Sequence, residues 1–157
     1  LDNEGQTVKI SSNGKYLLLS SLQDPGNLGT ILRTADALQI PAVLLDSCAD
    51  PYNPKTVRAS MGAVFRTQPV RMTRQQAIAA CRDAGIPLLA TAMSADAVDL
   101  RQAELHSAAV IIGSEGQGIC RELFDAAQGK IIIPMSPRCE SLNAAVAAAI
   151  VLWQMKR

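Results

Sequence analysis

Short apolar runs alternate with helical patterns along almost the whole chain, and most of these runs end in a polar or glycine-containing loop. This alternation is typical of a parallel sheet covered by helices on both faces. The runs predict strands near residues 16–20, 42–46, 65–70, 88–91, 108–113 and 130–133. The apolar spacings predict helices near residues 28–39, 54–61, 74–84, 119–128 and 141–156. We therefore expect an α/β domain with a mostly parallel sheet.

Composition is compatible with one such domain and excludes several other classes. The 157 residues are enough for a sizeable core, and because only 3% are aromatic, that core must be built from aliphatic side chains. No apolar run approaches the roughly 20 residues that span a membrane. Cys48, Cys81, Cys120 and Cys139 form no C-x-x-C pair and His106 is the only histidine, so a zinc site is not expected. We expect reduced, buried thiols and a cytoplasmic protein.

The formal net charge of only +1 is small for a protein that grips RNA by itself. Basic residues nevertheless gather in one part of the chain, at Lys55, Arg58, Arg66, Arg71, Arg74 and Arg82. Most of them fit a solvated surface. Arg58 and Arg66 are the candidates for contacts with RNA phosphates.

Three apolar runs lead into loops whose polar side chains a simple turn would not need. The loops are residues 23–30 (QDPGNLGT), 113–118 (GSEGQG) and 134–143 (PMSPRCESLN). Ligands of open α/β sheets bind outside the carboxyl ends of the strands, where such loops meet. The polar residues are therefore expected to form one constellation: Asn27, Arg33, Glu115, Ser141 and Asn143. A structural role is also open, with Ser141 as a helix N-cap and Asn27 as a turn former.

These segments resemble the three signature motifs of the SpoU/TrmH-type RNA 2'-O-methyltransferases of the SPOUT superfamily. The first motif is Asn27 followed by residues 33–35 (RTA), the second is residues 113–116 (GSEG), and the third is residues 133–135 (IPM) followed by 141–143 (SLN). Residues 53–55, 58–60 and 62–66 are also similar to the family, and the resemblance covers nearly the whole chain from Lys15. It implies a SPOUT fold with a C-terminal trefoil knot, a homodimer, and no membrane or metal partner.

The resemblance also implies the cofactor and the roles of particular residues. S-adenosyl-methionine would contact Thr91, Ala92, Gly113, Ile133, Met135 and Leu142, with Gly113 allowing a close backbone approach. Arg33 would hold the acceptor phosphate and help to activate the ribose hydroxyl. A guanidinium is a poor general base because its pKa is above about 12, so deprotonation assisted by the substrate phosphate is preferred. Asn27 and Glu115 would orient their neighbours, and Ser141 and Asn143 would complete the pocket.

The last predicted helix carries an apolar stripe of Leu142, Val146, Ala149, Ile150 and Trp153, which we expect to lie in the core. Alanines on its remaining surface would let another backbone approach closely. Family resemblance places this helix in a dimer interface.

The first 14 residues are polar and are expected to be a linker left from a longer protein with an RNA-binding domain, so that residues 15–157 form the catalytic domain. The expected function is methyl transfer to a ribose 2'-hydroxyl, with rRNA favoured over tRNA. Two alternatives remain: a non-catalytic RNA-binding or ribosome-assembly protein, and a SPOUT enzyme that methylates a base nitrogen.

Overall fold

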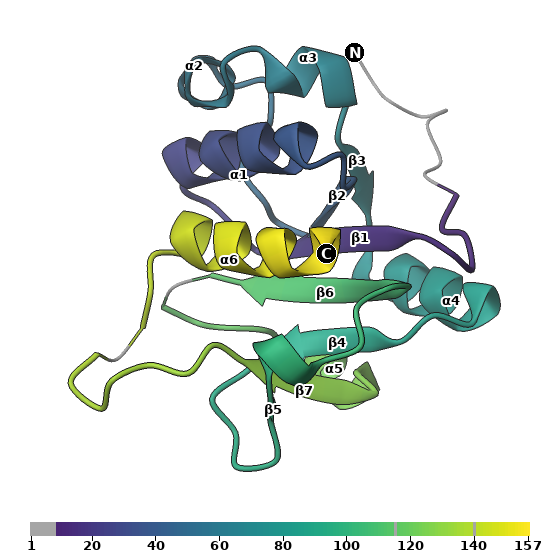
Figure 1. Ribbon diagram of the computed structural model, residues 1–157. Coiled ribbons are helices and arrows are strands. Elements are labelled where there is room, and N and C mark those ends of the chain that lie inside the picture. Colours follow the sequence, from purple (N-terminus) through teal and green to yellow (C-terminus); the bar gives the residue numbers. More distant parts are fainter. Residues whose placement is uncertain (1–8, 115, 140) are drawn as a thin grey trace.

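The computed structural model describes residues 9–114, 116–139 and 141–157. Seven parallel strands form one sheet in the order β3-β2-β1-β6-β4-β7-β5 (Figure 1). The strands are β1 (Lys15–Ser20), β2 (Ala42–Leu45), β3 (Val70–Met72), β4 (Leu88–Thr91), β5 (Val98–Asp99), β6 (Ala108–Gly113) and β7 (Gly129–Ile132). Because they are all parallel, their carboxyl ends lie at one edge, where the loops gather.

Helices cover both faces of this sheet, which confirms the predicted fold class. They are α1 (Pro25–Ala37), α2 (Pro54–Ser60), α3 (Ala63–Thr67), α4 (Arg74–Ala84), α5 (Arg121–Ala126) and α6 (Ala144–Lys156), with a 3-10 turn η1 at Leu100–Gln102. α1 and α6 pack on one face and α4 and α5 on the other, while α2 and α3 pack on the outside of α1 (Figure 1). The trefoil knot stays a prediction.

The core follows the two-residue period of the buried strands. Leu17 and Leu19 of β1 face α1 and α6, whereas Tyr16 and Leu18 face the cluster beneath α4 and α5. All four are almost completely buried, as expected for a central parallel strand. The core is largely aliphatic, as the composition predicts.

The strand predicted over residues 65–70 is wrong. The chain instead forms the short helix α3 and then β3, which begins only at Val70. Left-handed backbone at Met61 and Gly62 (φ 53° and 83°) turns the chain, and Gln68 (φ 45°) ends the helix. Ala63 and Val64 at the start of α3 are buried, whereas Phe65, the first residue of the predicted strand, is exposed.

Local capping explains most of the shifted helix boundaries. α1 begins at Pro25 rather than residue 28, because the Asp24 side chain accepts a hydrogen bond from the Asn27 N–H and proline suits the first helical turn. α6 begins at Ala144 rather than residue 141, because Asn143 is its N-cap. α5 is shorter than predicted, and β5 and η1 were not predicted at all.

The orientation of α6 differs from the prediction. Val146, Ile150 and Trp153 are exposed, with 49%, 38% and 66% of their surface accessible, so this stripe is not core. The opposite side, including Ala144, Ala145 and Ala148, packs against the sheet and α1. Small alanine side chains let the helix lie close to these neighbours.

The four cysteines are free thiols. Cys48 and Cys81 are buried as expected, whereas Cys120 is half-buried and Cys139 is exposed, which corrects the expectation of a packed Cys139. Within the described part of the chain, no helix combines the length and apolarity needed to cross a membrane. Nor does any cluster of three or more His, Cys, Asp or Glu there offer a metal site.

Candidate active site

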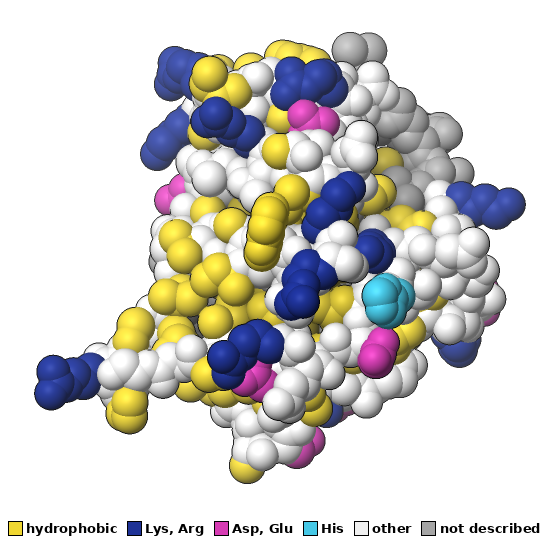
Figure 2. Space-filling view, viewed as in Figure 1, with side chains coloured by type: hydrophobic (Ala, Val, Ile, Leu, Met, Phe, Trp, Pro, Cys, Tyr) yellow, Lys and Arg dark blue, Asp and Glu magenta, His cyan; other side chains and the backbone are white. Residues whose placement is uncertain are grey.

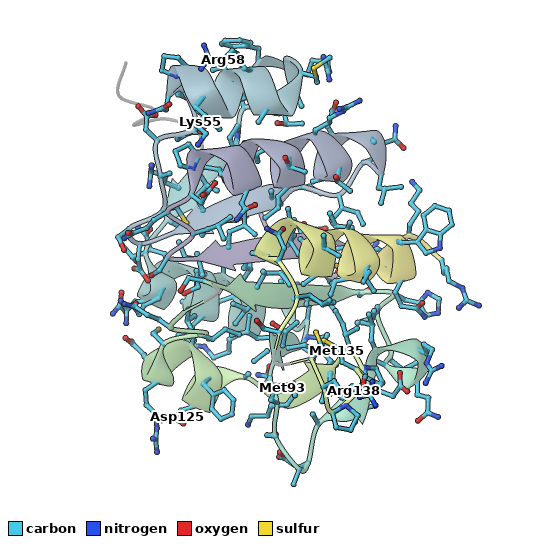
Figure 3. All side chains as sticks on the ribbon, turned by 90° about the vertical axis from the view of Figure 1, so that its left-hand side faces the viewer. Lys55, Arg58, Met93, Asp125, Met135 and Arg138 are labelled. Carbon is cyan, nitrogen blue, oxygen red and sulfur yellow. The ribbon has the colours of Figure 1, made fainter. Side chains whose placement is uncertain are left out.

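A largely apolar cavity of about 420 Å³ opens at the carboxyl ends of β4 and β7, beside the start of α6. It is lined by Thr91, Ala92, Met93, Gln117, Gly118, Ile119, Phe124, Ile131, Ile132, Ile133, Met135, Ser141, Leu142 and Ala147. The lining contains five of the six residues predicted to contact a cofactor, and Ser141. Figure 3 looks onto this edge and shows Met93 and Met135 below α6.

Gly113 is the sixth predicted residue, and it contributes in a different way. A Cβ at this position would lie only 2.5 Å from the carbonyl carbon of Gly118 and 2.8 Å from the Ile119 nitrogen. Gly113 therefore leaves room for Gly118 and Ile119 to lie close to its backbone, and these two residues form part of the cavity wall. The Gly118 N–H donates to the backbone carbonyl oxygen of Ser114 at 2.9 Å, and Gly118 adopts a φ of 65°. Glu115, predicted to orient neighbouring side chains, lies outside the described residues.

Two of the predicted catalytic residues meet next to the cavity-lining Ser141 and Leu142. Asn143 Nδ2 donates to Asn27 Oδ1 at 3.2 Å, joining positions 116 residues apart in the sequence. Asn143 Oδ1 accepts from the N–H groups of Ala145 and Val146, at 2.8 and 3.2 Å. The Asn143 side chain therefore caps the start of α6 and links it by a hydrogen bond to the first turn of α1. Ser141 does not cap the helix and is an exposed residue of the cavity lining.

Arg33 lies on α1 and is exposed. In the described part of the chain its guanidinium makes no hydrogen bond or ion pair. No carboxylate among the described residues thus neutralises this positive charge.

The two predicted RNA-binding arginines lie on the far side of α1, away from the cavity. Arg58 is exposed on α2 (Figure 3). Arg66 donates two hydrogen bonds to Asp36 Oδ2, at 3.0 and 2.8 Å, so part of its charge is neutralised. Of the two, Arg58 is the more available to a phosphate.

Sequence reasoning missed several cavity residues. Met93 follows Thr91 and Ala92, which the family resemblance had selected, past the end of β4. Phe124 falls within the helix predicted over residues 119–128 and was not singled out, but it lines the cavity, with Lys130 Nζ 4.6 Å from its ring centroid. In the loop after Met93, the Ser94 hydroxyl donates to Asp96 and holds the pKa of that carboxyl below its usual range.

A parallel sheet with an apolar cavity at its carboxyl edge and paired polar groups beside it defines a ligand-binding α/β domain. Residues 14–153 match the model of the SpoU rRNA Methylase family. The chain belongs to this family, which confirms the resemblance of its motifs.

Individual relatives agree with that assignment. The chain is 36% identical to the 23S rRNA (guanosine(2553)-2'-O)-methyltransferase RlmP of Bacillus subtilis, over 94% of this chain and 60% of the relative. It superposes on the AdoMet-bound rRNA methyltransferase of Sinorhizobium meliloti with a TM-score of 0.88 and 36% identity, over 96% of this chain and 58% of the other. It also matches the SpoU methyltransferase AviRb of Streptomyces viridochromogenes in complex with AdoMet, with a TM-score of 0.84 and 30% identity, over 99% and 64% of the two chains. The chain therefore spans about 60% of the length of these relatives.

Proposed function

We propose that this chain is the catalytic part, residues 15–157, of an S-adenosyl-methionine-dependent enzyme that methylates a ribose 2'-hydroxyl of RNA. The observation that carries the proposal is the Asn27–Asn143 hydrogen bond, since Asn143 directly follows the cavity-lining Ser141 and Leu142. Two motifs remote in sequence are joined there, with Arg33 on the same helix as Asn27. We place the protein in the cytoplasm, where its free thiols suit a reducing environment.

The cavity fits this cofactor in size and chemistry. Its volume of about 420 Å³ is within the range of small-molecule sites, roughly 300–1,000 Å³. Ile133, Met135 and Leu142 offer apolar surface to an adenine ring, while Thr91 and Ser141 add hydroxyl groups at the lining. These residues would hold the cofactor, which supplies an activated methyl group on a sulfonium.

The protein's own residues have to position the acceptor and exclude water. Alignment of two reactants lowers a barrier by roughly 7–11 kcal/mol, so little covalent help is needed. The Asn27–Asn143 pair fixes the two loops between which the ribose would lie. Arg33 would bind the acceptor phosphate and hold it near the 2'-hydroxyl, whose proton passes to that phosphate. Glu115 would orient neighbouring side chains, and Ser141 would complete the cofactor and ribose pocket together with Asn143.

Arg33→Lys tests this assignment, because lysine keeps the charge but loses the planar, two-pronged donor. We expect methyl transfer to fall at least about tenfold while cofactor affinity is unchanged. Near-normal turnover with an unchanged pH profile would remove Arg33 from the reaction.

The proposed RNA is ribosomal. The support is the description of the matching family and the 23S rRNA substrate in the name of the Bacillus subtilis relative. Methylation of rRNA fragments followed by nucleoside analysis distinguishes a 2'-O-methyl product from a methylated base.

We also propose a homodimer formed through α6. Its exposed Val146, Ile150 and Trp153 lie beside a second apolar cavity of about 500 Å³, and Trp153, Ile150, Pro134 and Ile133 line that cavity. Figure 2 shows hydrophobic side chains exposed on the face that carries α6. Ile133 lines both cavities, so a partner seated on α6 would also shield the cofactor site.

Calorimetric titration with S-adenosyl-methionine tests the proposed function directly. We expect micromolar binding by the wild-type chain and a large loss of affinity in Asn143→Ala. A folded dimer that binds no cofactor would overturn the enzymatic proposal in favour of a non-catalytic RNA-binding protein.

A further inference from the structure

Two aromatic side chains touch each other on the surface of the helical layer outside α1. The rings of Tyr52 and Phe65 have centroids 6.2 Å apart with an interplanar angle of 36°. Tyr52 is 40% and Phe65 59% exposed, and Met61 beside them in sequence is 64% exposed. The chain has only one Trp, two Tyr and two Phe, so this pair is a large share of its aromatic side chains. We call Tyr52 and Phe65 the aromatic pair.

The local fold holds Phe65 outward. Ala63 and Val64 anchor α3 in the core with no exposed surface, so the next side chain along this single turn points to solvent. The Ser60 hydroxyl joins α2 to α3 by donating to the Val57 oxygen at 2.8 Å and accepting from the Val64 N–H at 3.5 Å. The aromatic pair is therefore presented on a fixed support, which lowers the entropic cost of binding.

Basic side chains predominate around the pair, although Asp50 accepts a hydrogen bond from the Tyr52 N–H at 2.9 Å and Asp36 pairs with Arg66. From Pro51 to Arg82 the sequence contains six Lys or Arg and no Asp or Glu. Four of the six have acidic or backbone-carbonyl partners: Arg66, Arg71, Arg74 and Arg82. Lys55 and Arg58, both on α2, make no ion pair with the described residues.

Lys55 connects this surface to the candidate active site. Its Cε lies 3.7 Å from the point where a Cβ at Gly26 would be, so its side chain reaches the start of α1, next to Asn27. Figure 3 shows Lys55 between α2 and α1, with Arg58 above it on α2. Figure 2 shows Lys and Arg side chains beside hydrophobic ones over these helices. Free cations and exposed rings thus form one surface leading to the Asn27–Asn143 pair.

We propose that the aromatic pair stacks an unpaired base of the RNA strand next to the acceptor nucleotide, while Lys55 and Arg58 bind its phosphates. Exposed rings interleaved with basic side chains are the means by which proteins hold single-stranded nucleic acid. This inference rests on the proposed function and adds a base-stacking contact to it. A second copy of the chain does not fit this surface, because two such basic faces would repel one another.

Fluorescence anisotropy at low ionic strength tests the proposal with two labelled probes: a short oligoadenylate, and the same ribose-phosphate backbone without bases. We expect wild-type protein to prefer the probe with bases. Phe65→Ala should lose this preference through a roughly five- to 150-fold weaker affinity for oligoadenylate, since stacking contributes that range per base. Phe65→Tyr keeps an aromatic ring and should retain the preference for the probe with bases.

Lys55→Ala provides the complementary control. This substitution should lower the affinity for both probes equally and reduce the salt dependence of binding, because a phosphate contact does not distinguish bases. The proposal would be overturned if wild type and Phe65→Ala bound each of the two probes with the same affinity, or if neither protein bound either probe.

The same variants separate this inference from the proposed function. Phe65→Ala should bind S-adenosyl-methionine as wild type does, because the ring lies outside the cofactor cavity. Normal cofactor binding without any base preference would reject the stacking role and leave the methyltransferase proposal standing. A change in oligomeric state on Phe65→Ala would assign the aromatic pair to a protein contact and would also overturn it.

Discussion

At the scale of single residues, Asn143 has two separable tasks. Its Oδ1 caps α6, and its Nδ2 holds Asn27. Serine caps helices about as well as asparagine, but its short hydroxyl cannot cap and reach Asn27 together. We expect Asn143→Ser to keep the melting temperature close to wild type while cofactor affinity or methyl transfer falls at least about tenfold. Thermal denaturation and calorimetry measure the two effects on one sample.

The matched controls are Asn143→Ala and Ser141→Ala. Asn143→Ala loses both the cap of α6 and the hydrogen bond to Asn27, so its unfolding free energy should also fall by about 1 kcal/mol. The second removes an exposed hydroxyl that caps nothing and should leave stability unchanged. If Asn143→Ser retained full affinity and activity, the bond to Asn27 would have no functional part.

The sequence was sufficient to group Asn27 with Asn143, because parallel strands bring their following loops to one edge. It was not sufficient to pair their side chains, since the N-cap position depends on where α6 actually begins. Residues 141 and 143 are both good capping residues, and only the packed helix selects Asn143. Phe124 was missed for a related reason: its position within a predicted helix does not show that it lines the cavity.

At the scale of secondary-structure elements, the contact between α1 and α2 depends on Gly29. A Cβ there would lie 2.4 Å from the Thr56 carbonyl oxygen and 2.6 Å from the Ala59 Cβ. Alanine normally favours a helix interior over glycine, but here the clash outweighs that gain. We expect Gly29→Ala to lower the unfolding free energy by about 1–3 kcal/mol, the usual cost of overpacking.

Chemical denaturation measures this change, and Gly26→Ala is the control on the same helix. Its Cβ would approach only the Asp24 and Lys55 side chains, at 3.2 and 3.7 Å. Its effect should stay below about 1 kcal/mol. Equal effects of the two substitutions would show that the α1–α2 approach is not tight.

The packing of α4 predicts a pH dependence. Burial raises the pKa of the Cys81 thiol from 9.0 to about 11. The native state thus holds the thiol proton more tightly than the unfolded chain does. The protonated thiol therefore contributes fully to the unfolding free energy below pH 9, and this contribution is lost as the pH rises towards 11. The loss is on the order of 2 kcal/mol. Denaturation of wild type and Cys81→Ala across this interval should show the steeper decline in wild type; parallel curves would contradict it.

The error for α6 has a physical cause at this scale. Both sides of the helix are apolar, so periodicity alone does not say which side faces the sheet. Ala144, Ala145 and Ala148 face the core because small side chains permit a close approach, and Trp153 is left outside. The strand predicted over residues 65–70 failed because left-handed residues, not visible as a periodicity, turn the chain there.

At the scale of the whole molecule, the unpartnered face of α6 and the basic surface of α2 and α3 are two different interaction surfaces. The first is apolar and has Trp153 66% exposed. The second carries free cations around the aromatic pair. A dimer that used α6 would leave the basic surface of each subunit available to RNA.

The last prediction follows from that division. Trp153→Glu places a charge in the proposed α6 interface, where desolvation is costly, so we expect the dimer to dissociate in sedimentation experiments. Phe65→Glu is the matched control, because it exchanges a similarly exposed ring for the same charge on the other surface and should sediment like wild type. Since a partner on α6 would shield the cavity through Ile133, the Trp153→Glu monomer should also bind S-adenosyl-methionine more weakly. A wild-type chain that is monomeric, or a Trp153→Glu variant that stays dimeric, would move the interface away from α6.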